Sequence, residues 1–246
     1  MKVGIIGFGR LGRLIARYLK EDADIIVCDI SDISKEAKEL GVVQGTLDEV
    51  CACPIVIPFV PISEFEKLII QIKDKLKSGT LLVDVCSVKE LPVNAMLKHL
   101  PEKVQILATH PMFGPDSARE TVFGHKIVLC PVRIEEKLYQ DITRYLNGHG
   151  LKVIESTAEE HDRQISHSLV LAHFIGRTLM DTGAQRQEIE TLGYKRLMKI
   201  LGVVQNDSWQ LFVDMNKYNR FADQARARFI GSLTAIDQKL RLGDDE

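Results

Sequence analysis

The chain of 246 residues lacks the features that mark several large classes of protein. No apolar run reaches the roughly 18–20 residues that a membrane-spanning helix needs. Lysine and arginine number 32 against 34 acidic residues, so no basic excess favours nucleic acid or an anionic membrane surface. The first residues also lack a charged segment followed by a long apolar one, the pattern of a secretory signal. We therefore expect a cytoplasmic protein that binds neither nucleic acid nor membrane.

The five cysteines are an odd set, which argues against the disulfide framework of a secreted protein. Cys51 and Cys53 form a C-x-C pair, but neither a second Cys pair nor a His pair lies at the spacing of a zinc site. We therefore predict no metal site. Most of the cysteines should be small core residues; they are Cys28, Cys51, Cys53, Cys86 and Cys130.

Apolar runs rich in Val, Ile and Leu alternate with helical patterns over the first 155 residues. Continuous apolar runs of this length are typical of strands that are buried on both faces of a sheet. Alternating strands and helices predict an α/β fold with a Rossmann-type doubly wound, mostly parallel sheet. The predicted strands are 2–7, 24–29, 54–59, 80–85, 104–109, 125–130 and 151–155, and the predicted helices are 10–20, 63–77, 92–100 and 134–147.

The pattern changes to helices alone after about residue 155, which predicts two domains, 1–155 and 156–246. Residues 156–159 (Ser-Thr-Ala-Glu) match a capping box at the start of the first helix. Between residues 165 and 180 that helix is apolar on nearly every side, so it must be buried, and a homodimer interface is the natural partner. We expect disorder in the tail, 243–246. The predicted helices are 157–182, 186–202 and 207–240.

Three glycines follow the first predicted strand in the pattern G-x-G-x-x-G. In this context Gly7 allows a tight turn, Gly9 lets the backbone approach a pyrophosphate, and Gly12 lets the helix pack on the strand. The backbone N–H groups and the helix dipole would then hold the phosphates. The other interpretation is a glycine turn without a ligand. The expected cofactor-binding segment is Gly7, Phe8, Gly9, Arg10, Leu11 and Gly12, although Arg10 is equally consistent with a solvated helix residue.

Asp29 ends the second predicted strand, where a carboxylate can accept hydrogen bonds from a ribose. Such a carboxylate repels a 2′-phosphate, so we favour NAD as the cofactor and keep NADP as the alternative. Asp29 is also compatible with an ordinary residue of the turn that follows the strand. The prolines of residues 57–62 force an extended loop, and Pro61 is a candidate for the wall of the cofactor site.

Two further segments follow predicted strands at the edge where ligands bind in such folds. They are residues 84–90 (Asp-Val-Cys-Ser-Val-Lys-Glu) and 109–115 (Thr-His-Pro-Met-Phe-Gly-Pro). Both resemble the central motifs of the prephenate and arogenate dehydrogenases of tyrosine biosynthesis, especially the single-domain plant-like and bacterial branch. Residues 160–163 and 191–194 are also similar to that branch. The resemblance implies oxidative decarboxylation of prephenate or arogenate with hydride transfer to NAD(P), giving 4-hydroxyphenylpyruvate or tyrosine.

The resemblance also implies roles for residues in the two motifs. His110 would be the general base that takes the hydroxyl proton as hydride leaves the same carbon. Ser87 would hydrogen-bond the reacting hydroxyl and His110. The alternatives are a structural loop histidine and a serine that caps the next helix. Lys89 would orient the loop or contact the cofactor.

The substrate carries carboxylates, so the resemblance implies an arginine from the helical domain. Arg196 is the best match, with Lys195, Lys199 and Arg163 as competitors. His167 and His173, six residues apart, lie about 120° apart on a helix, and each either lines the pocket or belongs to the core. An acidic residue would favour the ammonium group of arogenate. Asp116 and Glu120 are candidates, but residues 118–121 depart from the pattern of the branch, so substrate preference stays open.

Two other functions fit parts of the sequence. A β-hydroxyacid dehydrogenase would use a lysine deep in the helical domain, and Lys195 or Lys199 could supply it. That interpretation leaves the His-Pro-Met-Phe-Gly-Pro segment unexplained. A non-catalytic NAD-binding sensor needs only the glycine loop and a dimer, and it predicts that Ser87 and His110 lie far apart.

Overall fold

The computed structural model describes residues 1–243, apart from the side chain of Val203. Residues 244–246, which belong to the tail for which we expect disorder, lie outside that range. The chain divides into two compact units, Met1–His161 and the residues from Asp162 onward. This division falls inside helix α7, Ala158–Ile165, whereas the boundary predicted from sequence precedes that helix.

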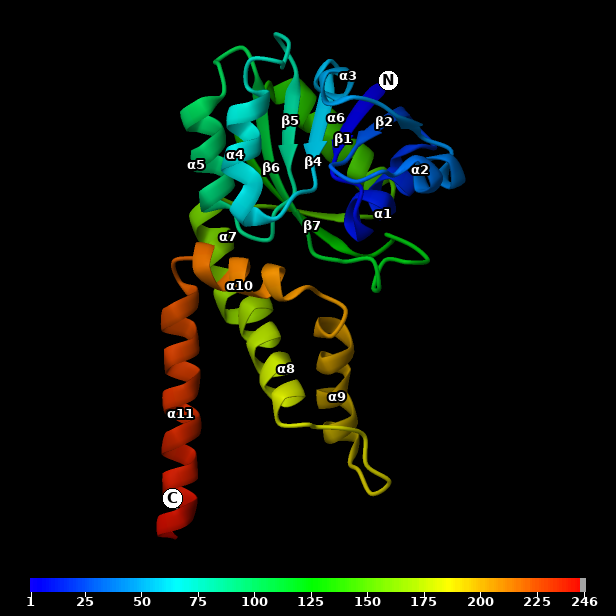
Figure 1. The fold of residues 1–246 in the computed structure, drawn as a ribbon. Helices are drawn as coiled ribbons and strands as arrows, with labels where there is room; N and C mark the ends of the chain where they lie inside the picture. Colours follow the sequence, from blue (N-terminus) through cyan, green and yellow to red (C-terminus); the bar gives the residue numbers. More distant parts are fainter. Residues whose placement is uncertain (244–246) are drawn as a thin grey trace. The chain divides into compact units, whose positions relative to one another are not determined.

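The first unit is built on one eight-stranded sheet, in the order β3-β2-β1-β4-β5-β6-β7-β8 (Figure 1). Strands β6 and β7 are antiparallel, and all other neighbouring strands are parallel. This topology confirms the predicted Rossmann-type, mostly parallel sheet. The strands are β1 Lys2–Ile6, β2 Asp24–Cys28, β3 Val43–Gln44, β4 Ile55–Pro58, β5 Leu81–Asp84, β6 Gln105–Pro111, β7 Lys126–Arg133 and β8 Lys152–Glu155.

Six helices of the first unit connect these strands: α1 Arg10–Leu19, α2 Ser34–Leu40, α3 Leu47–Cys51, α4 Ile62–Ile72, α5 Glu90–His99 and α6 Glu136–Gly148. The sequence analysis missed α2, β3 and α3, which are short. A capping box marks the start of α3, because Thr46 Oγ1 accepts from Glu49 N at 3.2 Å and Thr46 N donates to Glu49 Oε2 at 2.7 Å.

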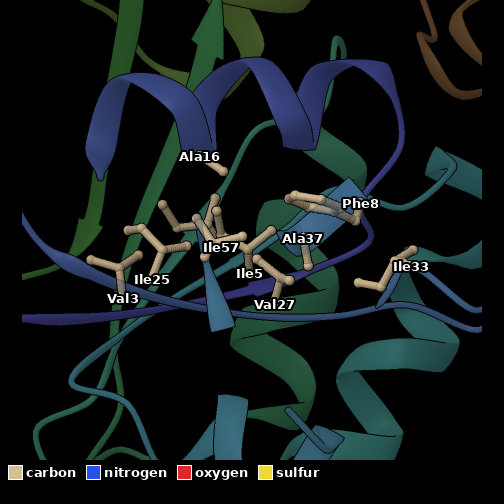
Figure 2. Packing of buried hydrophobic residues seen from close by; sticks show 10 residues of the cluster. Val3, Ile5, Phe8, Ala16, Ile25, Val27, Ile33, Ala37 and Ile57 are labelled. Carbon is tan, nitrogen blue, oxygen red and sulfur yellow. The ribbon is translucent and has the colours of Figure 1, made fainter. Parts of the chain in front are cut away.

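The core of this unit begins at its first strand, where apolar side chains fill the space between the sheet and helix α1 (Figure 2). Val3 and Ile5 come from β1, Val27 comes from β2, and Phe8 closes the cluster from the glycine loop. Most residues of β1, β2, β4, β5 and β6 are therefore buried as predicted, whereas β8, which matches the predicted strand 151–155, is largely exposed. All five cysteines are buried as well, and none of these described residues forms a disulfide.

The chain beyond Asp162 is helical. Helix α7 continues through a π-helical turn, Ser166–Val170, into α8, Leu171–Asp181, and is followed by α9 Leu192–Val204, α10 Trp209–Tyr218 and α11 Ala222–Leu242. The predicted all-helical C-terminal region is confirmed. Among the described residues, no helix combines the length and apolar character of a membrane span.

Three boundaries predicted for these helices were wrong. The first helix is capped by Thr157, whose Oγ1 accepts from Glu160 N at 3.2 Å, and not by Ser156. Helix α9 starts at Leu192, six residues later than the 186 predicted, because Thr191 Oγ1 accepts from Tyr194 N at 3.2 Å. The single helix predicted over 207–240 is broken at Asn219, whose extended backbone ends α10 and whose Oδ1 accepts from Phe221 N at 3.0 Å.

The apolar helix predicted over 165–180 is only partly covered. Within α8 only His173 and Gly176 are buried, and the remaining apolar residues are half-buried or exposed. Apolar side chains are also exposed along α11, at Ile230, Leu233, Ile236 and Leu240.

Candidate active site

The carboxyl ends of four parallel strands share one edge of the sheet. Ile6 at the end of β1 pairs with Cys28 and Pro58, and Asp84 at the end of β5 pairs with Ala108 of β6. The segments that follow these residues carry the glycine loop, Ser87 and His110. The topology therefore brings the predicted cofactor and catalytic motifs to one edge, where ligands bind in open α/β sheets.

The glycine loop contains two glycines that the protein itself requires. Gly7 has a φ of +93°, and a Cβ there would lie 2.3 Å from the Phe59 carbonyl oxygen. A Cβ at Gly12 would lie 2.4 Å from the Gly7 carbonyl oxygen. A Cβ at Gly9, by contrast, meets nothing within 4 Å. The backbone at Gly9 is thus open to an approaching group, as a dinucleotide pyrophosphate requires.

Asp29 is held in place by the glycine loop. Its Oδ2 accepts a hydrogen bond from Phe8 N at 2.6 Å, and its Oδ1 accepts one from Ser31 N at 2.9 Å. The Phe8 side chain points into the core in Figure 2, so only its backbone borders the loop surface. The carboxylate, at the end of β2, is fixed beside the loop with lone pairs remaining on both oxygens.

Arg10 lies at the start of α1 and pairs with Asp116, with 2.6 Å between Nη2 and Oδ1. Asp116 belongs to the segment after β6, which also docks on α1 through Tyr18, whose hydroxyl donates to the Ala118 carbonyl at 2.8 Å. Glu120 of the same segment is exposed, and its Oε1 lies 3.7 Å from Nε of Arg119. Leu11 is half-buried, and Pro61 is exposed at the start of α4.

His110 is a buried residue of β6, with 6% of its surface exposed, where it pairs with Val128 of β7. Its Nδ1 lies 2.8 Å from Nε2 of His161, and the two rings meet edge to face. Burial, the neighbouring His161 and the Lys89 ammonium lower the pKa of His110 well below 6.5. The imidazole is therefore neutral at pH 7, which a general base requires.

Lys89 links the ends of β5 and β6. Its fully buried ammonium donates to Asp84 Oδ2 and, at 2.5 Å, to the carbonyl oxygen of Thr109. Thr109 Oγ1 in turn donates to the Asp84 carbonyl at 2.7 Å. Burial raises the pKa of Asp84, and the Lys89 ammonium and the Cys86 N–H oppose that shift. Of the two roles considered for Lys89, these contacts favour the orienting one.

Ser87 follows β5, and β5 pairs with β6, the strand that carries His110. Its Oγ is buried and has no hydrogen-bond partner among the described residues. The hydrogen bond to His110 expected from the resemblance is therefore absent in this structure. Ser87 is not a helix cap either, because Lys89 holds that position before α5 and no side chain caps it. An unpartnered buried hydroxyl is unfavourable, which indicates a place for a polar group of a ligand.

His161 is the residue that sequence reasoning missed. It belongs to residues 160–163, which resemble the family, but no role was assigned to it. No pattern of spacing indicated its contact with His110, because 51 residues separate the two. The signal available in the sequence was the position of His161 in the first turn of a helix that begins at a capping residue, Thr157.

The predicted substrate-binding residues of the second unit differ in exposure. Arg196, Lys195 and Lys199 are exposed on α9. His167 is exposed and His173 is buried, so the two lie on different sides of their helix, as predicted. His173 Nε2 lies 3.7 Å from Asp207 Oδ2, and burial lowers the pKa of His173. No group of side chains in the described part of the chain has the composition of a metal site.

Comparison with known families identifies the chain. A family model described as "Prephenate dehydrogenase, nucleotide-binding domain" matches residues 15–155, more than half of the sequence. The chain belongs to the prephenate dehydrogenase family. A second model, "TYRAAT1-like, C-terminal domain", matches residues 178–246. The family resemblance seen in the sequence motifs is therefore confirmed.

Curated relatives extend over almost the whole chain. Arogenate dehydrogenase 1, chloroplastic, from Arabidopsis thaliana is 32% identical over 98% of this chain, which spans 39% of that protein. Arogenate dehydrogenase 2, chloroplastic, from the same plant is 29% identical, and the match covers 98% of this chain and 70% of that protein. A probable arogenate/prephenate dehydrogenase from Methanocaldococcus jannaschii is 29% identical, and the match covers 100% of this chain and 58% of that protein. The chain thus spans less than two thirds of two of these relatives.

Solved structures share the fold. Prephenate dehydrogenase from A. aeolicus, in complex with hydroxyphenyl propionate and NAD+, has a TM-score of 0.79 and 20% identity, with 100% of this chain and 92% of that chain covered. Synechocystis arogenate dehydrogenase has a TM-score of 0.73 and 18% identity, with 100% and 94% covered.

Proposed function

We propose that this protein oxidises and decarboxylates prephenate or arogenate with transfer of a hydride to NAD(P), giving 4-hydroxyphenylpyruvate or tyrosine. The observation that carries the proposal is the pair of buried groups at neighbouring strand ends. His110 is a neutral imidazole, and Ser87 has a hydroxyl without a partner among the described residues. Ser87 follows β5, and His110 lies near the end of β6, in the sheet that also carries the open glycine loop. Family membership and the names of the relatives agree with this chemistry.

The residues of the chain supply the proton chemistry. His110 accepts the proton of the ring hydroxyl at Nε2, because its Nδ1 is engaged with His161. Ser87 Oγ hydrogen-bonds the same hydroxyl and orients it toward the imidazole. NAD, when bound, accepts the hydride that leaves the carbon bearing this hydroxyl. Loss of carbon dioxide then makes the ring aromatic.

The first unit provides the features that a dinucleotide requires. The open backbone at Gly9 and the first turn of α1 would hold the pyrophosphate. The fixed Asp29 carboxylate would accept hydrogen bonds from the adenosine ribose and repel a 2′-phosphate. We therefore favour NAD over NADP. Leu11 remains a proposed residue of the cofactor-binding loop, and Pro61 remains a proposed residue of the wall of the site.

Groups that bind the substrate are also proposals. Arg196 is the proposed partner of the substrate carboxylates, and His167 and His173 are proposed pocket residues. Asp116 already pairs with Arg10, so we favour Glu120 as the residue that would meet the ammonium group of arogenate. Lys195 and Lys199 are exposed, so they offer no deep lysine of the kind that a β-hydroxyacid dehydrogenase uses.

We also propose the organisation predicted from sequence, with a dinucleotide-binding domain over 1–155 and a substrate and dimerisation domain over 156–246. The support for a homodimer is the row of exposed apolar side chains on α11, for which we propose a second copy of the chain as the partner. A cytoplasmic location and the lack of nucleic acid and membrane partners also remain predictions. Two plant relatives are named chloroplastic, so cell fractionation is the test of location.

Steady-state kinetics test the reaction. Prephenate and arogenate are each assayed with NAD and with NADP at 340 nm, beside a panel of β-hydroxy acids. We expect turnover with prephenate or arogenate, and faster turnover with NAD. His110→Asn should lower kcat by about 10²- to 10⁴-fold, since it removes the general base. The exposed His149→Asn serves as the control. NAD binding by His110→Asn should stay within twofold of the unmodified protein.

Two results contradict the proposal. One is the absence of NAD(P) reduction with both cyclohexadienols. The other is unchanged turnover in His110→Asn, which would remove that residue from the chemistry.

A further inference from the structure

Helix α7 places a second imidazole against the proposed base. His161 is 3% exposed, and its Nε2 lies 2.8 Å from Nδ1 of His110, with the ring planes at 65°. At this distance one nitrogen carries the proton and donates it to the other. The hydrogen bond therefore decides which nitrogen of His110 carries a proton in the neutral state.

Only one of the two arrangements leaves His110 active as a base. If His161 donates, the lone pair at Nδ1 of His110 is used, and the proton of the neutral ring lies on Nε2. If His110 donates from Nδ1, its Nε2 keeps a lone pair that accepts a proton. We propose that His161 is a positioning residue whose Nε2 accepts from Nδ1–H of His110 and so holds His110 in the tautomer that accepts at Nε2. This proposal rests on the proposed function.

The surroundings of the pair favour this arrangement. The charged group that lowers the pKa of His110 besides His161 is the Lys89 ammonium, held by Asp84 at the end of β5. When His110 gains the proton, its Nδ1–H still donates to His161 and nothing has to rotate. An imidazole partner can orient the base as the carboxylate of a Ser-His-Asp triad does.

Variants of His161 separate orientation from packing. His161→Gln keeps an oxygen that can accept from Nδ1–H, whereas His161→Leu keeps bulk and removes the acceptor. We expect His161→Leu to lower kcat about 10- to 100-fold, with KM and the Kd for NAD within twofold. His161→Gln should recover most of this loss. His149→Leu, at an exposed histidine, is the matched control.

The pH profile provides a second readout. The acid limb of kcat/KM reports loss of the neutral base. Because an acceptor for Nδ1–H stabilises the protonated form of His110, its removal in His161→Leu should move the limb to lower pH, and His161→Gln should leave the limb near its original position. A role in packing alone would leave the position of this limb unchanged.

The decisive readout does not depend on turnover. ¹⁵N NMR of histidine-labelled protein at pH 7.5, with the His110 signals assigned through His110→Asn, locates the proton on each ring. We expect it on Nδ1 of His110 in the unmodified protein, and distributed over both nitrogens in His161→Leu.

A proton on Nε2 of His110 would overturn the proposal, as would unchanged kcat and pH profile in His161→Leu. If neither cyclohexadienol is oxidised, the proposed function fails, and the NMR result still decides the role of His161.

Discussion

The two units of the molecule place polar and apolar side chains in opposite ways. The first unit buries Asp84, Lys89, His110 and His161 and gives each of them a partner. The second unit leaves apolar side chains of α11 exposed, and in Figure 1 the C-terminal half of that helix lies apart from α8 and α9 of the same unit. Burying charges is unfavourable and is tolerated where geometry must be fixed. A contiguous row of exposed apolar side chains is typical of an interaction surface. The first unit thus fixes the groups that we propose for the chemistry, and the second exposes the surface that we propose for association.

The largest expected effect comes from breaking the buried pair of the first unit. Lys89→Met leaves the Asp84 carboxylate buried without its cation. The free energy of unfolding should fall by about 3–5 kcal/mol, measured as the urea midpoint and slope. The double variant Asp84→Asn/Lys89→Met should recover part of this loss.

The matched control is the exposed pair of Lys75 and Asp48, whose Nζ and Oδ1 lie 2.5 Å apart. Lys75→Met should cause no measurable change in stability, because solvent screens exposed ion pairs. An equal effect of the two lysine substitutions would show that burial of the pair does not matter.

The next effect tests the surface of the second unit. Ile230, Leu233, Ile236 and Leu240 follow one another at intervals of three or four residues along α11, so they share one side of the helix. Ile236→Lys should weaken the proposed homodimer by about 10- to 100-fold, or about 1.4–2.7 kcal/mol. Sedimentation equilibrium of the full chain gives the dissociation constant.

Gln238→Lys adds the same charge on another side of α11 and should leave the dimer intact. A protein that sediments as a monomer before any substitution would contradict the proposed dimer. Equal weakening by both lysines would point to charge instead of the apolar row.

The smallest effect is a pH dependence shared by one buried histidine in each unit. Burial is the main cause that lowers the pKa of His110 and of His173 below 6.5. The unfolded chain then binds more protons below pH 6.5, so the free energy of unfolding falls as pH drops through that window. Each group contributes at most about 1.4 kcal/mol per pH unit.

Urea midpoints at pH 7.5 and 5.5 measure this dependence. His110→Asn and His173→Asn should each flatten it, and His149→Asn should not. A slope that neither buried-site variant changes would assign the acid sensitivity to other groups.

Local patterns predicted much of the fold and part of the site. Apolar runs and helical periodicity located the main strands of the first unit, because residues close in sequence decide these features. The sequence analysis missed short elements such as α2 and β3, because they contain too few residues to show a helical or strand period. The sequence analysis also missed the break at Asn219. The Nδ2 of Asn219 donates to the Asp162 carbonyl oxygen at 2.7 Å, and 57 residues separate the two, so no local pattern indicates this contact.

The sequence by itself determined the glycine loop, the order of strands and helices, and the two motifs that carry Ser87 and His110. Each of these depends on residues only a few positions apart. The tertiary structure alone decided that Lys89 is fully buried against Asp84 and Thr109, that Arg10 pairs with Asp116 at a separation of 106 residues, and that His161 contacts His110. Such contacts arise when the strand order and the packing of the helices bring distant segments together. The resemblance of the motifs to a known family therefore pointed to the proposed base, and only the folded structure showed the contacts of Lys89 and His161 around it.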